Sequence, residues 1–98
     1  MGTAFRVFTT THFDAMLKKL VAGHPDLIEW YARALPILAA DPYNLTRRYH
    51  IKKLAGVAQG DAPWRLRLGR FRFRYDIEGT RVYLKACRLR SEDTYRGL

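Results

Sequence analysis

The chain has 98 residues, 48% of them hydrophobic and 28% charged, which is typical of one globular domain with a single modest core. Eighteen Lys and Arg against nine Asp and Glu give a net charge of +9, which favours an acidic or polyanionic partner. A single cysteine excludes an intramolecular disulfide and a cysteine-rich zinc site, and there is neither a signal peptide nor an apolar run that could span a membrane, so we expect one soluble, cytoplasmic domain over residues 1–98.

The first half of the chain predicts a short strand followed by two helices. Residues 4–10 are rich in β-branched and aromatic side chains, which favours a strand. Apolar residues at helical spacing over residues 11–22, behind a threonine that can cap the first turn, predict a helix. A second helix is expected to begin near Pro25, with Pro36 kinking it or ending it near Arg33.

Residues 43–63 give weaker signals. Two basic pairs flank a short stretch in which His50 is interpreted as an ordinary loop histidine rather than a proton carrier, and Leu54 is expected to anchor the segment to the core. Residues 56–63 have the composition of a loop. Residues 1–46 contain as many acidic as basic residues, so the whole positive excess lies in residues 47–98.

Residues 64–77 alternate apolar and charged side chains with the period of a strand, interrupted by Gly69-Arg70. A two-residue loop that begins with glycine suits a type II′ turn, so we expect a hairpin that pairs Leu68 with Phe71. A second hairpin is expected around Glu78-Gly79, followed by a strand over residues 80–87. In that register the paired residues are Tyr75 with Val82, Phe73 with Leu84 and Phe71 with Ala86.

The polar face of these strands is expected to carry two basic rows: Arg65, Arg74 and Tyr83 in one, and Arg67, Arg72 and Lys85 in the other. Cys87 falls on the same face near the strand end, where we expect a structural role. Directly opposed like charges destabilise a sheet by roughly 0.2 to 1 kcal/mol per pair. An anion that neutralises the face is the favoured explanation, and the alternative is a solvated surface whose long side chains cover apolar area.

The expected fold class is therefore α+β, in the order β-α-α-β-β-β, with a short C-terminal tail or helix starting near Ser91. Two helices would cover one face of a small, mainly antiparallel sheet and leave the arginine face open.

Three stretches resemble the RelE/ParE superfamily of type II toxins: residues 51–56, residues 64–77 with the strand after them, and residues 88–96. The resemblance implies a RelE-like fold and favours the RelE branch. It thus implies a toxin of a toxin-antitoxin system that inhibits translation, a metal-independent and cofactor-free endoribonuclease that cleaves messenger RNA on the ribosome. A cognate acidic antitoxin would hold it in check, and no membrane partner is expected.

The implied chemistry is attack of a ribose 2′-hydroxyl on the adjacent phosphate, which needs a base, cations and an acid. The resemblance assigns catalytic roles to Arg72, Arg88 and Tyr95, with Arg90 competing for the place of Arg88 because the spacing differs. Contacts to phosphate are expected from Lys52, Lys53, Arg65, Arg67, Arg74, Lys85 and Arg90. The general base stays open between Tyr95 and a lysine such as Lys52.

Two other functions remain in view. A ParE-like protein would inhibit DNA gyrase through protein contacts and would need no catalytic set. A non-catalytic basic module that only binds an acidic antitoxin would show the same charge pattern. Tyr95 itself fits packing on the sheet as well as catalysis.

Overall fold

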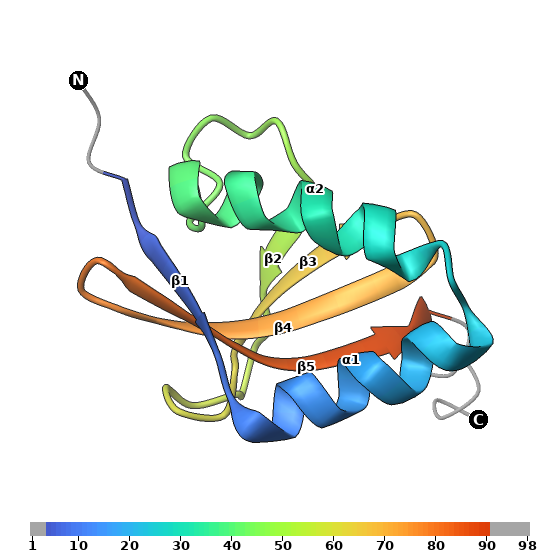
Figure 1. Cartoon of the computed structure of the whole chain (residues 1–98). Coiled ribbons are helices and arrows are strands. Elements are labelled where there is room, and N and C mark those ends of the chain that lie inside the picture. The colour runs from blue at the N-terminus through green and yellow to red at the C-terminus, as the bar shows by residue number, and fades with distance from the viewer. Residues whose placement is uncertain (1–3, 91–98) are drawn as a thin grey trace.

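The computed structural model describes residues 4–90, which form a five-stranded mixed sheet with two helices on one face (Figure 1). The elements are β1 (Arg6–Thr9), α1 (Thr11–Gly23), α2 (Leu27–Ala40), β2 (Ile51–Lys53), β3 (Trp64–Leu68), β4 (Phe71–Glu78) and β5 (Arg81–Leu89). The strand order across the sheet is β1-β5-β4-β3-β2, in which β1 runs parallel to β5 and all other neighbours are antiparallel. The predicted α+β class is confirmed, and the expected tail helix near Ser91 lies outside the described residues.

Strand β2 was not predicted. It is only three residues long and pairs with β3, placing Ile51 opposite Leu66 and Lys52 opposite Arg65. Three residues are too few to show a period-two pattern among so many charges, so this strand exists because β3 offers it an edge.

Pro36 was expected either to kink the second helix or to end it near Arg33. Helix α2 runs through Pro36 to Ala40, so the second of these expectations is wrong. Proline inside a helix costs about 3 kcal/mol. Leu38, beyond the proline, is completely buried, and such burial contributes about 1.5 to 3 kcal/mol. Packing of the last turn against the core therefore offsets much of the cost of the proline.

The predicted β3–β4 register is confirmed, with Leu68 opposite Phe71 and Leu66 opposite Phe73. Gly69 has a φ of +56°, as the first position of a type II′ turn requires. A Cβ atom at this position would also lie only 2.6 Å from Cε2 of Trp30. Glycine is therefore required here both by the turn and by the indole ring beside it.

The predicted β4–β5 register is wrong by two residues: Tyr75 lies opposite Leu84, and Ile77 opposite Val82. The turn consists of Gly79 and Thr80, since Glu78 and Arg81 form the last pair. Gly79 has a φ of +60°, so glycine again takes the first turn position, where a positive φ is needed. The predicted turn would have placed Glu78 there.

A β-bulge at Lys85 then changes the register of β5 once more. Tyr75 pairs with Leu84 but Arg74 pairs with Ala86, which leaves Lys85 as an extra residue on β5. Cys87 consequently lies opposite Phe73 in the core, not on the polar face as predicted. Burial raises the pKa of its thiol to about 12, which makes it an unreactive core residue.

One hydrophobic core fills the space between the helices and the sheet. It joins Phe13 of α1 and Leu27 and Leu38 of α2 to the inward side chains of β3, β4 and β5. The Tyr75 hydroxyl, deep in this core, donates a hydrogen bond of 2.7 Å to the carbonyl oxygen of Pro42. Neither helix in residues 4–90 is long and apolar enough to cross a lipid bilayer.

Candidate nucleic-acid interface

Three arginines lie in one line across the open face of the sheet. Arg67 of β3 is opposite Arg72 of β4, and Arg72 is opposite Arg88 of β5. Each arginine follows or precedes a core residue on its strand, so its side chain points away from the helices. Directly opposed residues have Cβ atoms about 4.5 to 5.5 Å apart. We call Arg67, Arg72 and Arg88 the arginine row.

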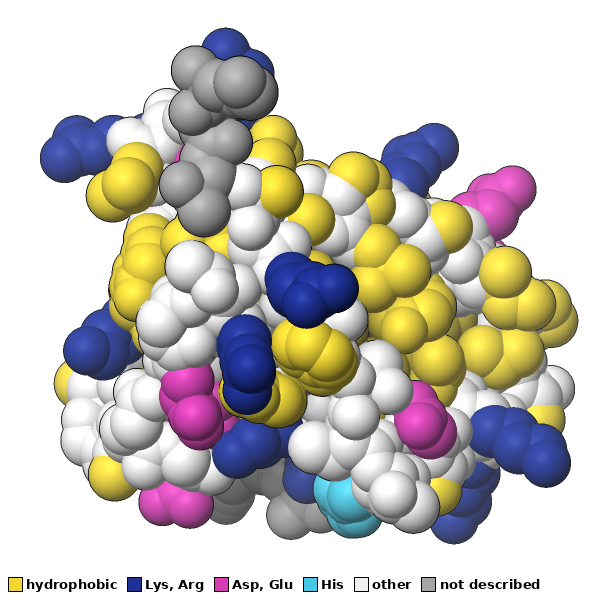
Figure 2. Space-filling view, turned by 60° about the vertical axis from the view of Figure 1, so that its left-hand side comes forward, with side chains coloured by type: hydrophobic (Ala, Val, Ile, Leu, Met, Phe, Trp, Pro, Cys, Tyr) yellow, Lys and Arg dark blue, Asp and Glu magenta, His cyan; other side chains and the backbone are white. Residues whose placement is uncertain are grey.

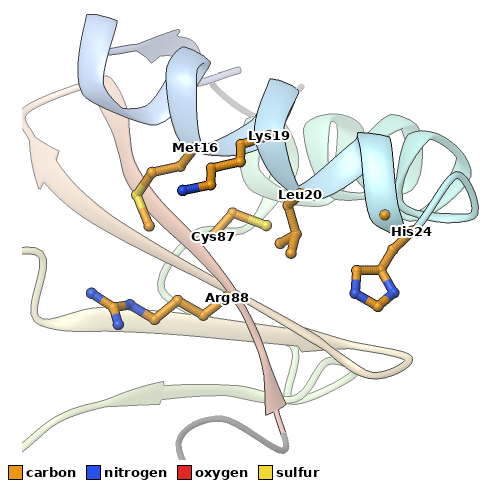
Figure 3. A pocket seen from close by; sticks show the side chains of 7 residues that line it. Met16, Lys19, Leu20, His24, Cys87 and Arg88 are labelled. Carbon is orange, nitrogen blue, oxygen red and sulfur yellow. The ribbon is translucent and has the colours of Figure 1, made fainter.

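The bulge at Lys85 is what places Arg88 in this row. Figure 3 shows the side chains of Cys87 and Arg88 on opposite sides of β5, with Cys87 directed toward Leu20 of α1. Without the extra residue, strict alternation from Leu84 would direct Arg88 toward the helices. The sequence prediction had Lys85 beside Arg72, and the structure has Arg88 there instead.

The arginine row has the charge and donor geometry of an anion site. Within residues 4–90, Arg67 and Arg88 form no ion pair, and Arg88 is exposed. Guanidinium groups can bind two oxygens of one phosphate through parallel hydrogen bonds. Three such groups in line can hold a phosphate together with the negative charge that develops when it is attacked.

A second line of basic residues runs beside the first, with Lys52 opposite Arg65 and Arg65 opposite Arg74. Lys52 is exposed and Arg65 is half-buried. Arg74 is occupied by the protein itself: its Nε donates to the carbonyl oxygen of Ala62 at 2.9 Å and its Nη2 to that of Asp61 at 3.0 Å. Arg74 therefore holds the 54–63 loop, and we leave it out of the interface.

Lys85 is occupied in the same way. Its Nζ lies 2.8 Å from Oδ2 of Asp76 and 2.9 Å from the carbonyl oxygen of Gly60. Asp76 is fully buried and also accepts hydrogen bonds from the backbone N–H groups of Gly60 and Ala62. Burial alone would raise the pKa of Asp76, but Lys85 and these two N–H groups hold it below its usual value. Lys85 is thus a partner of the loop rather than a member of the basic rows.

The remaining predicted residues lie apart from the row or outside the described residues. Neighbouring residues of a strand face opposite sides of the sheet, so Lys53 faces the helix side while Lys52 faces the open side. The Nζ atom of Lys53 lies 5.6 Å from the ring centroid of Trp64. The backbone N–H of Arg90 donates to the carbonyl oxygen of Arg70, beside the β3–β4 turn. Tyr95 lies outside the described residues.

His50 is a residue whose place the sequence analysis missed. Its carbonyl oxygen accepts a 2.9 Å hydrogen bond from the backbone N–H of Arg67, so it continues the β2–β3 pairing by one residue. Tyr49 and Ile51 on either side pack against the core, so His50 faces the open side and extends the arginine row at the edge of the sheet. Residues 49–52 alternate between apolar and polar side chains, and this alternation could have predicted the side that His50 faces. It was not used because no strand was predicted at β2.

Figure 2, in which the left-hand side of Figure 1 is turned forward, shows Lys and Arg side chains scattered among hydrophobic and acidic ones.

A pocket of about 400 Å³ lies between Met16, Leu20 and His24 of the α1 region and the end of β5 (Figure 3). It opens on the helix side of β5, and Arg88 is the one member of the arginine row among its lining residues. Among residues 4–90 no three His, Cys, Asp or Glu side chains gather to hold a metal ion.

Comparison with known proteins identifies the fold. No protein-family model matches the chain, and no curated protein does. The toxin-antitoxin complex RelBE2 from Mycobacterium tuberculosis contains a chain of 21% identity and a TM-score of 0.68, with 89% of this chain and 99% of that chain covered. The RelB-RelE complex from Methanococcus jannaschii gives 18% identity and a TM-score of 0.53, with 91% and 96% covered. The chain therefore has a RelE-like fold, as the sequence predicted.

Proposed function

We propose that this protein is the toxin of a type II toxin-antitoxin system and acts as a ribosome-dependent, metal-independent messenger RNA endoribonuclease. The observation that carries the proposal is the arginine row on the open face of a RelE-like fold. Cleavage by a 2′-hydroxyl needs preorganised cations where negative charge develops on the phosphate. Arg67, Arg72 and Arg88 supply three such groups on rigid strands.

Within this proposal Arg72, the centre of the row, binds the phosphate that is attacked, and Arg67 and Arg88 bind its oxygens from either side. Arg65 and Lys52, one line further along the strands, contact a neighbouring phosphate of the same RNA strand. The predicted catalytic role of Tyr95 and the predicted contact of Arg90 with phosphate stay part of the proposal.

The proposed regulatory partner is an acidic antitoxin. Two solved chains with the same fold are seen in complexes with antitoxins. A segment rich in carboxylates would neutralise the repulsion between Arg67, Arg72 and Arg88 and cover the same face that the RNA needs. Because it binds only the folded state, it should raise the thermal midpoint of the toxin as its concentration rises.

A cell-free translation assay with mapping of the messenger 5′ ends tests the activity. We expect cleavage of ribosome-bound messenger and none of the same RNA without ribosomes, with translation restored by the antitoxin. An absence of cleavage accompanied by trapped gyrase-DNA complexes in a parallel assay would favour the ParE-like alternative. An absence of both activities, with antitoxin binding retained, would favour the non-catalytic module.

A further inference from the structure

The open face of the sheet carries one described side chain along the arginine row that is not an arginine. His50 pairs with Arg67 through its backbone and faces the same side as Arg67, Arg72 and Arg88. It is exposed, and within residues 4–90 its imidazole makes no hydrogen bond or ion pair. The ring is therefore available to a molecule that binds across the row.

The arginine row by itself cannot complete the proposed reaction. Removal of a proton from a 2′-hydroxyl needs a group that gains and loses protons near neutral pH, and guanidinium groups stay protonated to above about pH 12. The carboxylate nearest along β4 is Asp76, which is buried and already bound to Lys85. Imidazole is the side chain best suited to proton exchange near neutral pH.

We propose that His50 is the general base of the cleavage, an inference that rests on the proposed function. A ring nitrogen of neutral His50 accepts the proton of the 2′-hydroxyl as the 2′ oxygen forms a bond to phosphorus. The bond between phosphorus and the 5′ oxygen breaks, and that oxygen takes a proton from a donor such as water. The products are a 2′,3′-cyclic phosphate and a 5′-hydroxyl end, and His50 returns its proton to solvent.

The surroundings of His50 suit this role. The charged groups that share its face are Lys52 on its own segment and Arg65 and Arg67 on β3, with Arg72 one strand further. All are cations, so none fixes the imidazole as the positive half of an ion pair. A phosphate drawn onto Arg67 and Arg72 brings its neighbouring ribose to the edge of the sheet where His50 lies.

The test compares His50→Ala and His50→Gln with the parent protein in single-turnover cleavage of ribosome-bound messenger. A general base contributes about 10² to 10⁴-fold, so the cleavage rate should fall at least a hundredfold in both variants. RNA affinity should change less than twofold, because the phosphate contacts remain. The matched control is His12→Ala, which removes another exposed histidine, at the start of α1, and should leave the cleavage rate unchanged.

Two further measurements separate a base from a merely structural residue. The cleavage rate of the parent should depend on pH, as general-base catalysis requires, and His50→Ala should lose that dependence. Added imidazole should restore part of the activity of His50→Ala and leave that of Arg72→Ala unchanged. A parent that does not cleave overturns the proposed function and this inference together. A parent that cleaves while His50→Ala keeps its rate and pH profile overturns the role of His50 alone.

Discussion

The ammonium group of Lys85 lies 2.8 Å from the buried carboxylate of Asp76, and Lys85 is also the extra residue that forms the bulge in β5. The ion pair and the bulge are therefore one feature. It draws Lys85 toward the 54–63 loop and turns the remainder of β5 so that Arg88 faces the same side as Arg72. A carboxylate that contacts no arginine of the row thus helps to assemble the row.

Replacing Asp76 with Ala should lower the free energy of unfolding by about 3 to 5 kcal/mol, because Lys85 and two backbone N–H groups would lose their acceptor. Asp76→Asn keeps one acceptor oxygen and should cost less. Urea denaturation at pH 7 measures both. Asp14→Asn, at an exposed position in the first turn of α1, is the control and should cost less than about 1 kcal/mol. Equal losses at the two positions would contradict the role given to Asp76.

Acid should destabilise the protein in a way that Asp76 partly accounts for. The pKa of Asp76 is lowered in the folded state, since hydrogen bonds outweigh the effect of burial, so its contribution is complete above the unfolded pKa of about 4 and is lost as the pH falls through the folded value. The free energy of unfolding should decline from about pH 5 downward. Asp76→Asn should show a shallower decline, and a decline as steep as that of the parent would count against this assignment.

Arg72→Ala should reduce the rate of messenger cleavage at least about a hundredfold, the scale of losing one preorganised donor to the transition state. Arg72→Lys should recover only part of the rate, because an ammonium cannot bind two phosphate oxygens in a fork. Relief of the repulsion from Arg67 and Arg88 should contribute less than about 1 kcal/mol to stability, and urea denaturation checks that the variant folds. Arg6→Ala, on the edge strand β1 and outside the arginine row, is the control. Normal folding with undiminished cleavage would remove Arg72 from the site.

The salt dependence of RNA binding should report which basic side chains contact phosphates. The proposed contacts to two phosphates, one bound by the arginine row and one by Arg65 and Lys52, predict a slope of about −1.4 in a log-log plot, at about −0.7 per phosphate for a single strand. Arg88→Ala should weaken binding and make the slope less steep by less than about 0.7, because Arg67 and Arg72 still contact the same phosphate. Arg74→Ala should leave it unchanged, because Arg74 is bound to the 54–63 loop. Equal effects of the two substitutions would mean that the loop does not withdraw Arg74.

Two glycines with similar backbone angles should respond differently to alanine. Gly79→Ala should cost about 1 to 2 kcal/mol, the penalty of a left-handed conformation with open space around the new Cβ. Gly69→Ala should cost more, because its Cβ would lie 2.6 Å and 2.7 Å from two carbons of the Trp30 ring. Thermal and urea denaturation of the two variants measure the difference. Equal costs would show that Trp30 moves aside freely.

The sequence predicted most where local pattern and turn chemistry agree. Alternation and Gly69 together defined the β3–β4 hairpin and so the pairing of Arg67 with Arg72. Alternation alone cannot detect a slip of two residues, because every side chain keeps its face, so the β4–β5 register depended on the turn and was misplaced at Gly79. A prediction that placed Gly79, rather than Glu78, in the first turn position would have given the observed register.

The rest of the candidate site depends on contacts between distant parts of the chain. Arg88 lies beside Arg72 because of the bulge in β5, which occurs together with the contact between Asp76 and Gly60 of the 54–63 loop. No local sequence pattern predicts that contact. The same loop withdraws Arg74 and Lys85 from the basic face. His50 lies next to Arg67 only because the segment that contains β2 pairs with the free edge of β3.

The parallel pairing of β1 with β5 has a consequence for how the protein comes into being. Strand β1 has a single neighbour in the sheet, which is β5 (Figure 1). Arg6 and Thr9 therefore cannot pair until Arg81 and Leu84 have been synthesised. Contacts between such distant segments form late, and a nascent chain that stops short of β5 cannot close the sheet. Arg88 is added later still. The complete arginine row of a protein proposed to cut messenger RNA therefore cannot form during translation before the segment up to Arg88 has been made.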